Sequence, residues 1–459
     1  KHLNGDGDSF KITGYERGIV RYADRFSYAY RVNVSVSPSE GWELYITPFG
    51  KRVLLKVPTV FTQLTPSSGI DLLGEEVNFN STRSSDGNFI MLDDSFPSSS
   101  QTQIAANIFD EDGERVFGYV SSSDPTGGWN PAGVSAMKNS KLIYDYFLTK
   151  HNRDSFDDKG SPLVSIVDYQ SIEGECFNNA FWSGSRMTYG DGCFETDGLF
   201  KNFAGSLDVA THEVAHGVVQ FTSNLRYENQ SGALNESYAD IFGVSVDYMV
   251  RGNNSNWLIG EAIMRPGLFM RDFRNPASGI APQPAHMDDY RFLPIDKDHG
   301  GVHANSGIQN RAFYLLVEGN EKERIGTSIG RDDAETIIYA ALLKLTPSSE
   351  YIDSANQWAI EAELIFGANS RQVTAVQQAW ANVGIDIGVA EETDSTDENE
   401  ETNDGDSEDP PAESENQRDI PLPPGDDVVV YLVAQDGSTG SGDDPTNEQY
   451  DLMLYNAAQ

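Results

Sequence analysis

The segment LDVATHEVAHGVVQ, residues 207–220, decides the fold and chemistry predicted for this 459-residue chain. It has a helical pattern, and HEVAH within it places two histidines four residues apart. Residues four apart share one face of a helix, so His212 and His216 can offer ring nitrogens to one metal ion. Glu213 lies beside them as a possible general base. The alternative at this point is a pair of solvated histidines on a helix surface.

A metal site needs a third ligand, and Glu236 in GALNESYADIFG, residues 232–243, is the candidate. It opens the next helical pattern, and a turn between the two helices could fold it back onto the first. Asp240 follows one turn later, where it could accept a hydrogen bond from the outer nitrogen of a ligand histidine. Two histidines and one glutamate leave a position for water, the pattern of catalytic zinc sites. Taken alone, Glu236 would be a first-turn carboxylate favoured by the helix dipole.

The chain is strongly acidic. Lys and Arg number 32 and Asp and Glu 71, so the formal net charge is −39. Nucleic acids and anionic membranes require basic surfaces, so neither is an expected partner. Hydrophobic residues make up 38% and aromatic residues 11%, which fits a folded protein that carries an acidic segment. The longest dense apolar run, VVVYLVA at 428–434, is far shorter than the ~20 residues of a membrane span.

The first part of the chain has strand patterns. Residues 26–57 alternate with period two and predict a half-buried hairpin, with Tyr28 on its apolar face. Residues 58–70 contain two prolines and predict a linker. Strand-like sequence follows over 71–120, and it returns at 163–190 after a helical stretch that begins near residue 133.

Helical spacing dominates the later part of the chain. The predicted helices cover about 206–222, 235–250, 306–318, 331–345, 354–366 and 371–382. Residues 391–419 hold 14 acidic residues, one arginine and no aromatic residue, so we expect a solvated linker there. Beyond it, VVVYLVA and YDLMLY at 450–455 flank a turn and predict a hairpin.

Four motifs together resemble the thermolysin family of secreted neutral metalloproteases, which includes pseudolysin-like and vibriolysin-like enzymes. They are HEVAHG, SGALNESYADIFG, DHGGVHANSG at 298–307 and NNAFWSGSRMTYGDG at 178–192. The resemblance covers roughly residues 68–386. It implies an α+β fold with two lobes, a β-rich N-terminal lobe and a mainly α-helical C-terminal lobe, with the zinc helix between them.

The resemblance also implies a division of the chain. Residues 1–66 would be the C-terminal part of a propeptide, which in this family inhibits the enzyme and assists its folding. Residues 67–217 would be the β-rich lobe ending in the HExxH helix, and residues 218–386 the helical lobe. We expect an acidic disordered linker over 387–419 and a truncated C-terminal β segment over 420–459.

The family motifs assign a role to each matching residue. The expected zinc ligands are His212, His216 and Glu236, and Glu213 is the expected base. Tyr227 and His303 resemble the donors that stabilise the oxyanion of the transition state, with Asp298 orienting His303. Asn235 and Asp240 resemble the hydrogen-bond partners of the zinc histidines.

Substrate binding is implied by the remaining motifs. Asn179 and Ala180 lie in a segment that, in this family, pairs with the substrate backbone as an added strand. Arg271 resembles the arginine that binds a substrate carbonyl. The pocket that receives the residue after the scissile bond is expected to be lined by Phe200, Val209 and Met270. Such a pocket favours bulky hydrophobic residues, although each of these three side chains could equally belong to the core.

One structural calcium ion is also implied. Asp208, Asp247 and Glu261 stand where family members place carboxylates around calcium. Asn256 and Leu258 stand where further carboxylates can occur, so we expect one ion rather than a cluster. A solvated acidic face is the alternative.

The two cysteines, Cys176 and Cys193, bracket the NNAFW segment. A disulfide between them would close a loop, which in the chain-entropy model stabilises the folded state by about 3 kcal/mol. It would also hold the substrate-binding strand. Two buried free thiols are the alternative, and the secretion implied by the family favours the disulfide. The other four histidines, His2, His151, His286 and His299, are expected to be ordinary structural or surface residues.

The predicted function is a secreted, extracellular, zinc-dependent endopeptidase made as a zymogen. Its expected partners are protein or peptide substrates and its own propeptide, and it is expected to be a monomer. Two competing classes are a non-catalytic binding protein on a protease scaffold and a zinc exopeptidase of another family. The complete set of ligand and base residues disfavours the first, and the full set of motifs disfavours the second.

Overall fold

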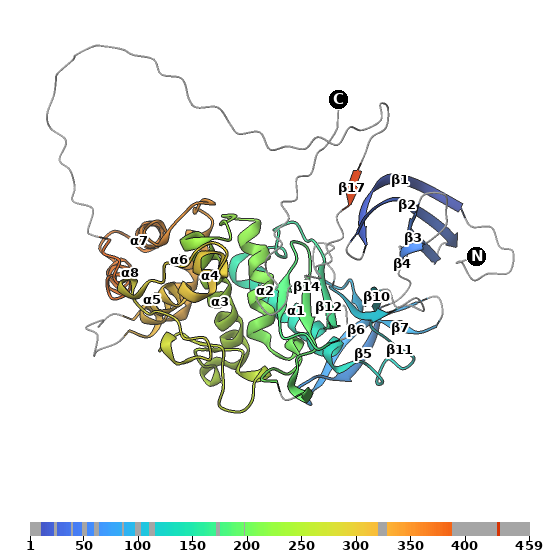
Figure 1. The fold of residues 1–459 in the computed structure, drawn as a ribbon, viewed down its shortest axis with the longest axis horizontal. Helices are drawn as coiled ribbons and strands as arrows, with labels where there is room; N and C mark the ends of the chain where they lie inside the picture. The colour runs from blue at the N-terminus through green and yellow to red at the C-terminus, as the bar shows by residue number, and fades with distance from the viewer. Residues whose placement is uncertain are drawn as a thin grey trace, which may run out of the picture.

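The computed structural model describes twelve segments of the chain. They are residues 11–22, 25–37, 40–47, 53–58, 64–84, 87–96, 102–109, 115–170, 175–196, 198–319, 328–387 and 429–431. In these segments a β-rich lobe and a helical lobe lie side by side, with helix α2 between them (Figure 1). No helix in these segments is both long enough and apolar enough to cross a membrane. The fold predicted from sequence is therefore confirmed.

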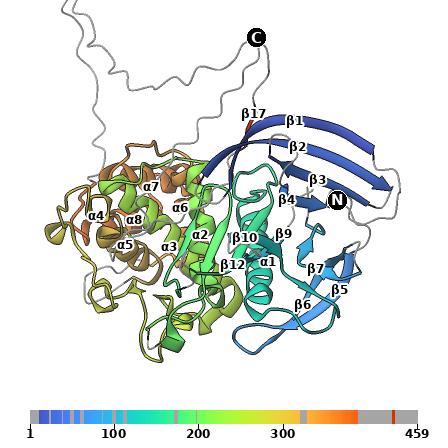
Figure 2. The ribbon, with the colours of Figure 1, turned by 45° about the vertical axis from the view of Figure 1, so that its right-hand side comes forward.

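A first sheet precedes the two lobes and lies next to the β-rich one (Figures 1 and 2). Its order is β17-β1-β2-β3-β4, and all pairs are antiparallel except the pair of β17 with β1. Its strands are β1 (Lys11–Tyr22), β2 (Arg25–Ser37), β3 (Glu40–Ile46), β4 (Val53–Pro58) and β17 (Val429–Tyr431). The hairpin predicted over 26–57 is thus the centre of a larger sheet.

The apolar face predicted for this hairpin is wrong at Tyr28. Tyr30 and Val32 pair across the strands with Ile46 and Leu44, as the alternation predicts. However, Tyr28 is 51% exposed and its neighbour Ala29 only 1%. A small side chain here fits where the larger ring does not, so period-two alternation does not identify the buried face along the whole strand. The hairpin predicted between VVVYLVA and YDLMLY lies outside the described residues, apart from β17.

The β-rich lobe begins with a four-stranded sheet of order β11-β7-β6-β5. Its strands are β5 (Leu64–Ile70), β6 (Glu76–Arg83), β7 (Phe89–Ile90) and β11 (Ser121–Ser122). The linker predicted over 58–70 is therefore wrong from residue 64 onward. Pro66 pairs with Asn80 in β5, which is an edge strand. Proline lacks a backbone N–H, which an edge strand tolerates on its open side, so the proline does not exclude a strand here.

A second sheet of the β-rich lobe carries the edge that faces α2. Its order is β10-β9-β12-β14-β13, with β8 also paired to β9. The strands are β8 (Leu92–Asp93), β9 (Thr102–Phe109), β10 (Arg115–Tyr119), β12 (Leu163–Tyr169), β13 (Ala180–Trp182) and β14 (Met187–Gly190). Helix α1 (Pro131–His151) packs on this sheet, and the Asn130 side chain caps its first turn. Strand β13 therefore lies at one edge of the sheet.

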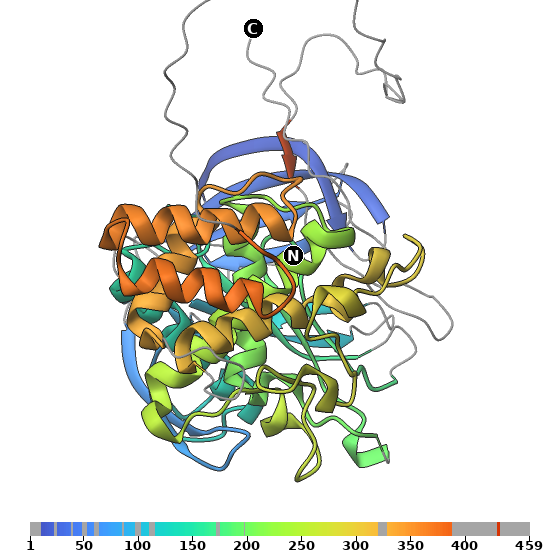
Figure 3. The same ribbon diagram turned by 90° about the vertical axis from the view of Figure 1, so that its left-hand side faces the viewer.

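The helical lobe is built around two long buried helices (Figure 3). These are α2 (Leu207–Gln220) and α3 (Asn229–Arg251), which pack against each other. The others are α4 (Asp298–Asn305), α5 (Gly307–Glu318), α6 (Gly330–Leu342), α7 (Tyr351–Phe366) and α8 (Arg371–Ala381). The loop after α3 contains the short strands β15 (Leu258–Ile259) and β16 (Arg271–Asp272). One continuous apolar core links both lobes through α2.

The predicted helices agree with these bounds to within three residues, apart from two larger differences. Helix α3 begins at Asn229, before the 235 that apolar spacing predicts, because its first turn consists mainly of polar residues. Helix α4 is not predicted at all. Its backbone has positive φ at four consecutive residues, 298–301, so no regular apolar period exists there.

Helices α1 and α6 meet through a mixed aromatic and charged contact. The His151 ring stacks on Tyr339, with centroids 4.1 Å apart, and its Nε2 lies 3.3 Å from the Tyr146 hydroxyl. The Tyr146 hydroxyl donates to Glu335 at 3.2 Å, and Lys150 forms an ion pair with Glu335 at 3.4 Å. His151 is therefore a half-buried structural histidine, in keeping with the expectation from sequence.

We predict that His151 makes the fold sensitive to acid. Burial, together with the nearby charges of Lys150 and Arg153, lowers its pKa from 6.5 to about 3. Below pH 6.5 the unfolded chain takes up a proton at this position and the folded chain does not. The free energy of unfolding should therefore fall by about 1.4 kcal/mol per pH unit from this group.

Urea unfolding of the wild type and of His151→Phe between pH 7 and pH 5 tests this prediction. The variant keeps an aromatic ring and should lose part of the acid dependence. Phe292→Leu, at an exposed aromatic ring without an ionisable group, serves as the control and should keep the acid dependence of the wild type. Identical pH profiles for the wild type and His151→Phe would contradict the prediction.

Candidate active site

Helix α2 lies directly under strand β13 because its residue 217 is glycine. A Cβ atom at Gly217 would lie 2.8 Å from the indole ring of Trp182 in β13. The Trp182 indole N–H donates to Gln220 Oε1 at 2.9 Å, and its backbone hydrogen-bonds the Glu213 carboxylate. The edge of the sheet is therefore fixed against the helix that carries HEVAH.

The three predicted metal ligands meet at one point. The Nε2 atoms of His212 and His216 are 3.1 Å apart. Glu236, in α3, places one carboxylate oxygen 3.3 Å from His212 Nε2 and the other 3.5 Å from His216 Nε2. Two ligands about 2.0–2.1 Å from one tetrahedral zinc ion are themselves about 3.3 Å apart. Both the donor set and its spacing therefore fit zinc.

The outer nitrogens of the two histidines are held by α3. Asp240 Oδ1 lies 2.8 Å from His212 Nδ1, and Asn235 Oδ1 lies 2.8 Å from His216 Nδ1. An acceptor at Nδ1 keeps the proton there and leaves the Nε2 lone pair directed at the metal position. Asn235 is itself oriented because its amide donates to the Leu225 carbonyl at 3.2 Å. These contacts match the arrangement expected for Asn235 and Asp240.

Asp240 also accepts two hydrogen bonds that sequence reasoning did not assign to it. Arg271 in β16 donates to its Oδ1 at 2.6 Å, and Asn310 in α5 donates to its Oδ2 at 2.8 Å. The carboxyl group is fully buried, and the charges of Arg271 and His212 outweigh burial and hold its pKa below the usual value. Asn310 lies in a helix far along the chain, and no local motif indicates this contact.

Glu213 lies beside the metal ligands and is buried. Burial raises its pKa to about 7, and the charge of Glu236 contributes in the same direction. A carboxyl group with a pKa near 7 can both accept and return a proton at neutral pH. Its position and its pKa therefore suit a general base.

Tyr227 and His303 form a pair of donors on the other side of Glu236. The Tyr227 hydroxyl lies 3.1 Å from His303 Nε2 and donates to the Glu236 carboxylate. Asp298 Oδ1 lies 2.5 Å from His303 Nδ1. Burial alone would lower the pKa of His303, but the charges of Glu236 and Asp298 raise it to about 9. The predicted oxyanion donors and the residue that orients one of them are thus brought together.

The predicted substrate residues lie in or next to β13 and β16, in α2 itself and in the segment before α2. Ala180 begins the edge strand β13, and the carbonyl of Asn179 accepts the Gly190 N–H at 2.9 Å. Arg271 pairs with Asp240, as described above. The three apolar side chains lie in the core or pack against it: Val209 is buried in α2, whereas Phe200 and Met270 are partly buried.

The three predicted calcium ligands include two carboxyl groups with raised pKa values. Burial raises the pKa of Asp247, and burial together with the charge of Asp208 raises that of Glu261 to about 6. Arg251 faces both, 3.0 Å from Asp247 and 3.8 Å from Glu261. Glu261 Oε2 is buried and has no hydrogen-bond partner. Within the described segments, only His212, His216 and Glu236 bring three ligand atoms within 4.8 Å of one another.

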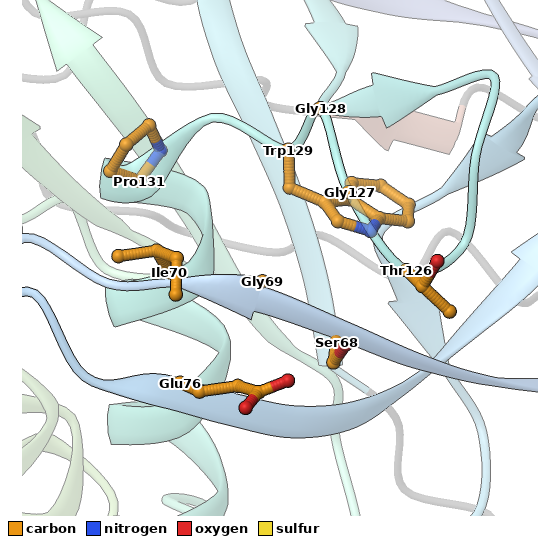
Figure 4. A pocket seen from close by; sticks show the side chains of 9 residues that line it. All are labelled: Ser68, Gly69, Ile70, Glu76, Thr126, Gly127, Gly128, Trp129 and Pro131. Carbon is orange, nitrogen blue, oxygen red and sulfur yellow. The ribbon is translucent and has the colours of Figure 1, made fainter.

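Two further features lie outside the metal site. Cys176 and Cys193 form a disulfide, as predicted. A pocket of about 150 Å³ lies between strands β5 and β6 and the segment before α1 (Figure 4). It is lined by Ser68, Gly69, Ile70, Glu76, Thr126, Gly127, Gly128, Trp129 and Pro131. None of these residues belongs to the predicted active site, so the pocket does not contribute to it.

An HExxH helix with a glutamate from the next helix is the arrangement of a zinc metallopeptidase. Comparison with known proteins agrees with this class. The model of the catalytic domain of thermolysin metallopeptidases matches residues 67–220, and that of their α-helical domain matches residues 223–385. The chain therefore belongs to the thermolysin family of metallopeptidases.

Individual relatives support the same assignment. Bacillolysin of Brevibacillus brevis is 36% identical over 372 residues, covering 79% of this chain and 66% of that protein. Thermolysin of Alicyclobacillus acidocaldarius subsp. acidocaldarius is 35% identical over 335 residues, covering 70% of this chain and 57% of that protein. The chain thus spans two thirds or less of the length of these relatives.

A solved structure shows the same fold. The precursor of protealysin, a metalloproteinase from Serratia proteamaculans, is 32% identical with a TM-score of 0.50. The match covers 62% of this chain and 88% of that one.

We predict that Asp240→Asn weakens zinc binding by about 10- to 100-fold. The change keeps the size of the side chain but removes the charge that makes His212 a stronger ligand and balances Arg271. Competition with a chelator at fixed pH measures the affinity. Asp332→Asn, at an exposed carboxylate, is the matched control and should bind zinc like the wild type. Equal affinities for Asp240→Asn and the control would contradict the prediction.

Proposed function

We propose that this chain is a zinc-dependent endopeptidase that hydrolyses protein substrates. The observation that carries the proposal is the convergence of His212, His216 and Glu236, 3.1–3.5 Å apart, beside the buried Glu213. Zinc held by these three residues would polarise the scissile carbonyl and lower the pKa of a bound water. The remaining steps follow from residues of the chain.

Glu213 is the proposed proton carrier. It takes a proton from the attacking water and then delivers it to the leaving amine. A pKa near 7 suits both steps. The carboxylate is a strong enough base to accept the proton from water, and the protonated group is a strong enough acid to give it to the amine. Its contact with the Trp182 backbone holds the carboxylate next to strand β13.

Tyr227 and His303 are the proposed donors to the oxygen that becomes negative as water attacks. Both already lie beside Glu236 and need little movement to reach that oxygen. Asp298 holds the Nδ1 proton of His303, so that Nε2–H points into the site. The raised pKa of His303 keeps this ring protonated at neutral pH.

The substrate is proposed to bind as an added strand along β13. An edge strand offers unpaired backbone groups, and Asn179 and Ala180 lie at its start. Arg271 would bind a substrate carbonyl while Asp240 fixes its position. Phe200, Val209 and Met270 would line the pocket for the residue after the scissile bond, so that bulky hydrophobic residues are preferred there.

We further propose the domain limits and the maturation of the chain. Residues 1–66 would be the C-terminal part of an inhibitory propeptide that assists folding, followed by lobes at 67–217 and 218–386. Residues 387–419 would be an acidic linker, and 420–459 a C-terminal β segment. Family matches that begin at 67 and end at 385 support these limits, as does the solved precursor. The disulfide supports secretion, since oxidising compartments preserve such bonds, and we propose an extracellular monomer.

Cleavage of a peptide blocked at both ends would separate an endopeptidase from an exopeptidase. The grouping of the proposed ligands, base and donors around Glu236 disfavours a non-catalytic binding protein.

We predict that Glu213→Gln keeps zinc and loses turnover. Glutamine fills the same space but cannot carry the proton, so kcat on casein should fall by about 10²- to 10⁴-fold. Zinc content and casein cleavage are measured on the same purified sample. Glu363→Gln, an equivalent change at an exposed site on α7, should keep both. Substantial activity in Glu213→Gln would refute the role of this residue.

We also propose that one calcium ion binds Asp208, Asp247 and Glu261. The unpartnered oxygen of Glu261 supports a cation at this position, as do the pKa values of Asp247 and Glu261, which burial and the charge of Asp208 raise. Calcium should raise the melting temperature of the zinc-loaded protein, because a ligand that binds only the folded state stabilises it. Glu261→Gln should reduce this shift and Glu363→Gln should not. A calcium-independent melting temperature in the wild type would overturn the proposal.

A further inference from the structure

The Cys176–Cys193 disulfide closes the open end of the hairpin that contains β13 and β14. Beyond the paired strands, the hairpin continues through two backbone hydrogen bonds. Gly190 N–H donates to the Asn179 carbonyl at 2.9 Å, and Gly192 N–H donates to the Phe177 carbonyl at 3.1 Å. The disulfide therefore links the two arms of this hairpin, and one of them carries the proposed substrate strand.

The same disulfide also lies against the segment that carries Phe200. Gly198 N–H donates to the Cys193 carbonyl at 2.7 Å. A Cβ atom at Gly192 would lie only 2.3 Å from the Lys201 carbonyl oxygen, so the two backbones are in direct contact. Cys193 is thus the junction between the edge strand and the proposed pocket wall.

The other contacts at this edge are non-covalent: Trp182 packs against Gly217 and donates to Gln220, and the Phe177 N–H donates to Asp191 at 2.8 Å. The disulfide is the covalent link across it. Strand β13 has only three residues, and its one partner in the sheet is β14. The two cysteines are partly exposed, so a reductant can reach the bond. The metal ligands, by contrast, lie on α2 and α3, which are buried in the common core.

We propose that this disulfide positions the substrate and that its redox state controls the cleavage of long substrates. In the oxidised protein it keeps Asn179 and Ala180, the start of the proposed substrate strand, in place. A dithiol reductant would transfer two electrons and two protons to the sulfurs, leaving two thiols and becoming a disulfide itself. The reduced protein then binds extended peptides weakly, while its zinc site and proton carrier are unchanged. This inference rests on the proposed function of β13.

Two blocked peptides test the proposal on the full chain. One is long enough to pair along β13, and the other has only one residue on each side of the scissile bond. In Cys176→Ser/Cys193→Ser, KM for the long peptide should rise roughly tenfold, with kcat and zinc content unchanged. KM for the short peptide should change little. Wild type folded first and then reduced with a water-soluble phosphine should behave the same, even if the double variant fails to fold.

The controls separate positioning from stability. The phosphine should have no effect on the double variant. If the wild type cleaves both peptides and the loss of the bond changes only the melting temperature, or changes both KM values equally, the inference is overturned and the proposed function stands. If the zinc-loaded wild type cleaves neither peptide, the proposed function fails and the inference fails with it.

Discussion

The structure depends on two carboxylates, Glu236 and Asp240, that are buried on one face of α3. A buried negative charge is stable only if it is paired and hydrogen-bonded. Glu236 is matched by the two histidines of α2, by the Tyr227 hydroxyl and by the metal that this set fits. Asp240 is matched by His212 and Arg271. The need to match these charges fixes α2 and β16 on α3 and brings His303 beside them.

The same constraint explains why acid–base groups of different strength lie so close together. Glu213 is buried without a direct cationic partner, so burial raises its pKa. Asp240 is equally buried, but Arg271 and His212 lower its pKa. Two carboxylates of one site therefore differ in their protonation, and the difference follows from the partners of each rather than from the depth of burial. Only the first is suited to exchanging protons at neutral pH.

The sequence predicts the parts of this arrangement that are local. HEVAH places three functional residues on one helix turn, and Glu236 and Asp240 share a face of the next helix, so spacing alone indicates a metal site. Asn310 is not predictable in this way, because its contact with Asp240 joins residues of α5 and α3 that are far apart in the chain. The strand-rich and helix-rich regions follow from periodicity, and the two lobes follow from the family resemblance. Helix α4 follows from neither, since positive φ values interrupt its turns. The strand at Pro66 and the exposure of Tyr28 depend on which elements pack against each strand. A local sequence pattern holds no information about those neighbours.

The hydrogen bond between Arg271 and Asp240 has a thermodynamic consequence. Asp240 is shared between a zinc histidine and the arginine proposed to bind the substrate. A ligand that draws the guanidinium toward itself leaves more of the carboxylate's charge to His212, which makes that imidazole a stronger donor to the metal. Metal affinity and ligand affinity are thus linked, and each must change the other by the same factor. Peptide binding along β13 would then be measurable as slower loss of zinc to a chelator.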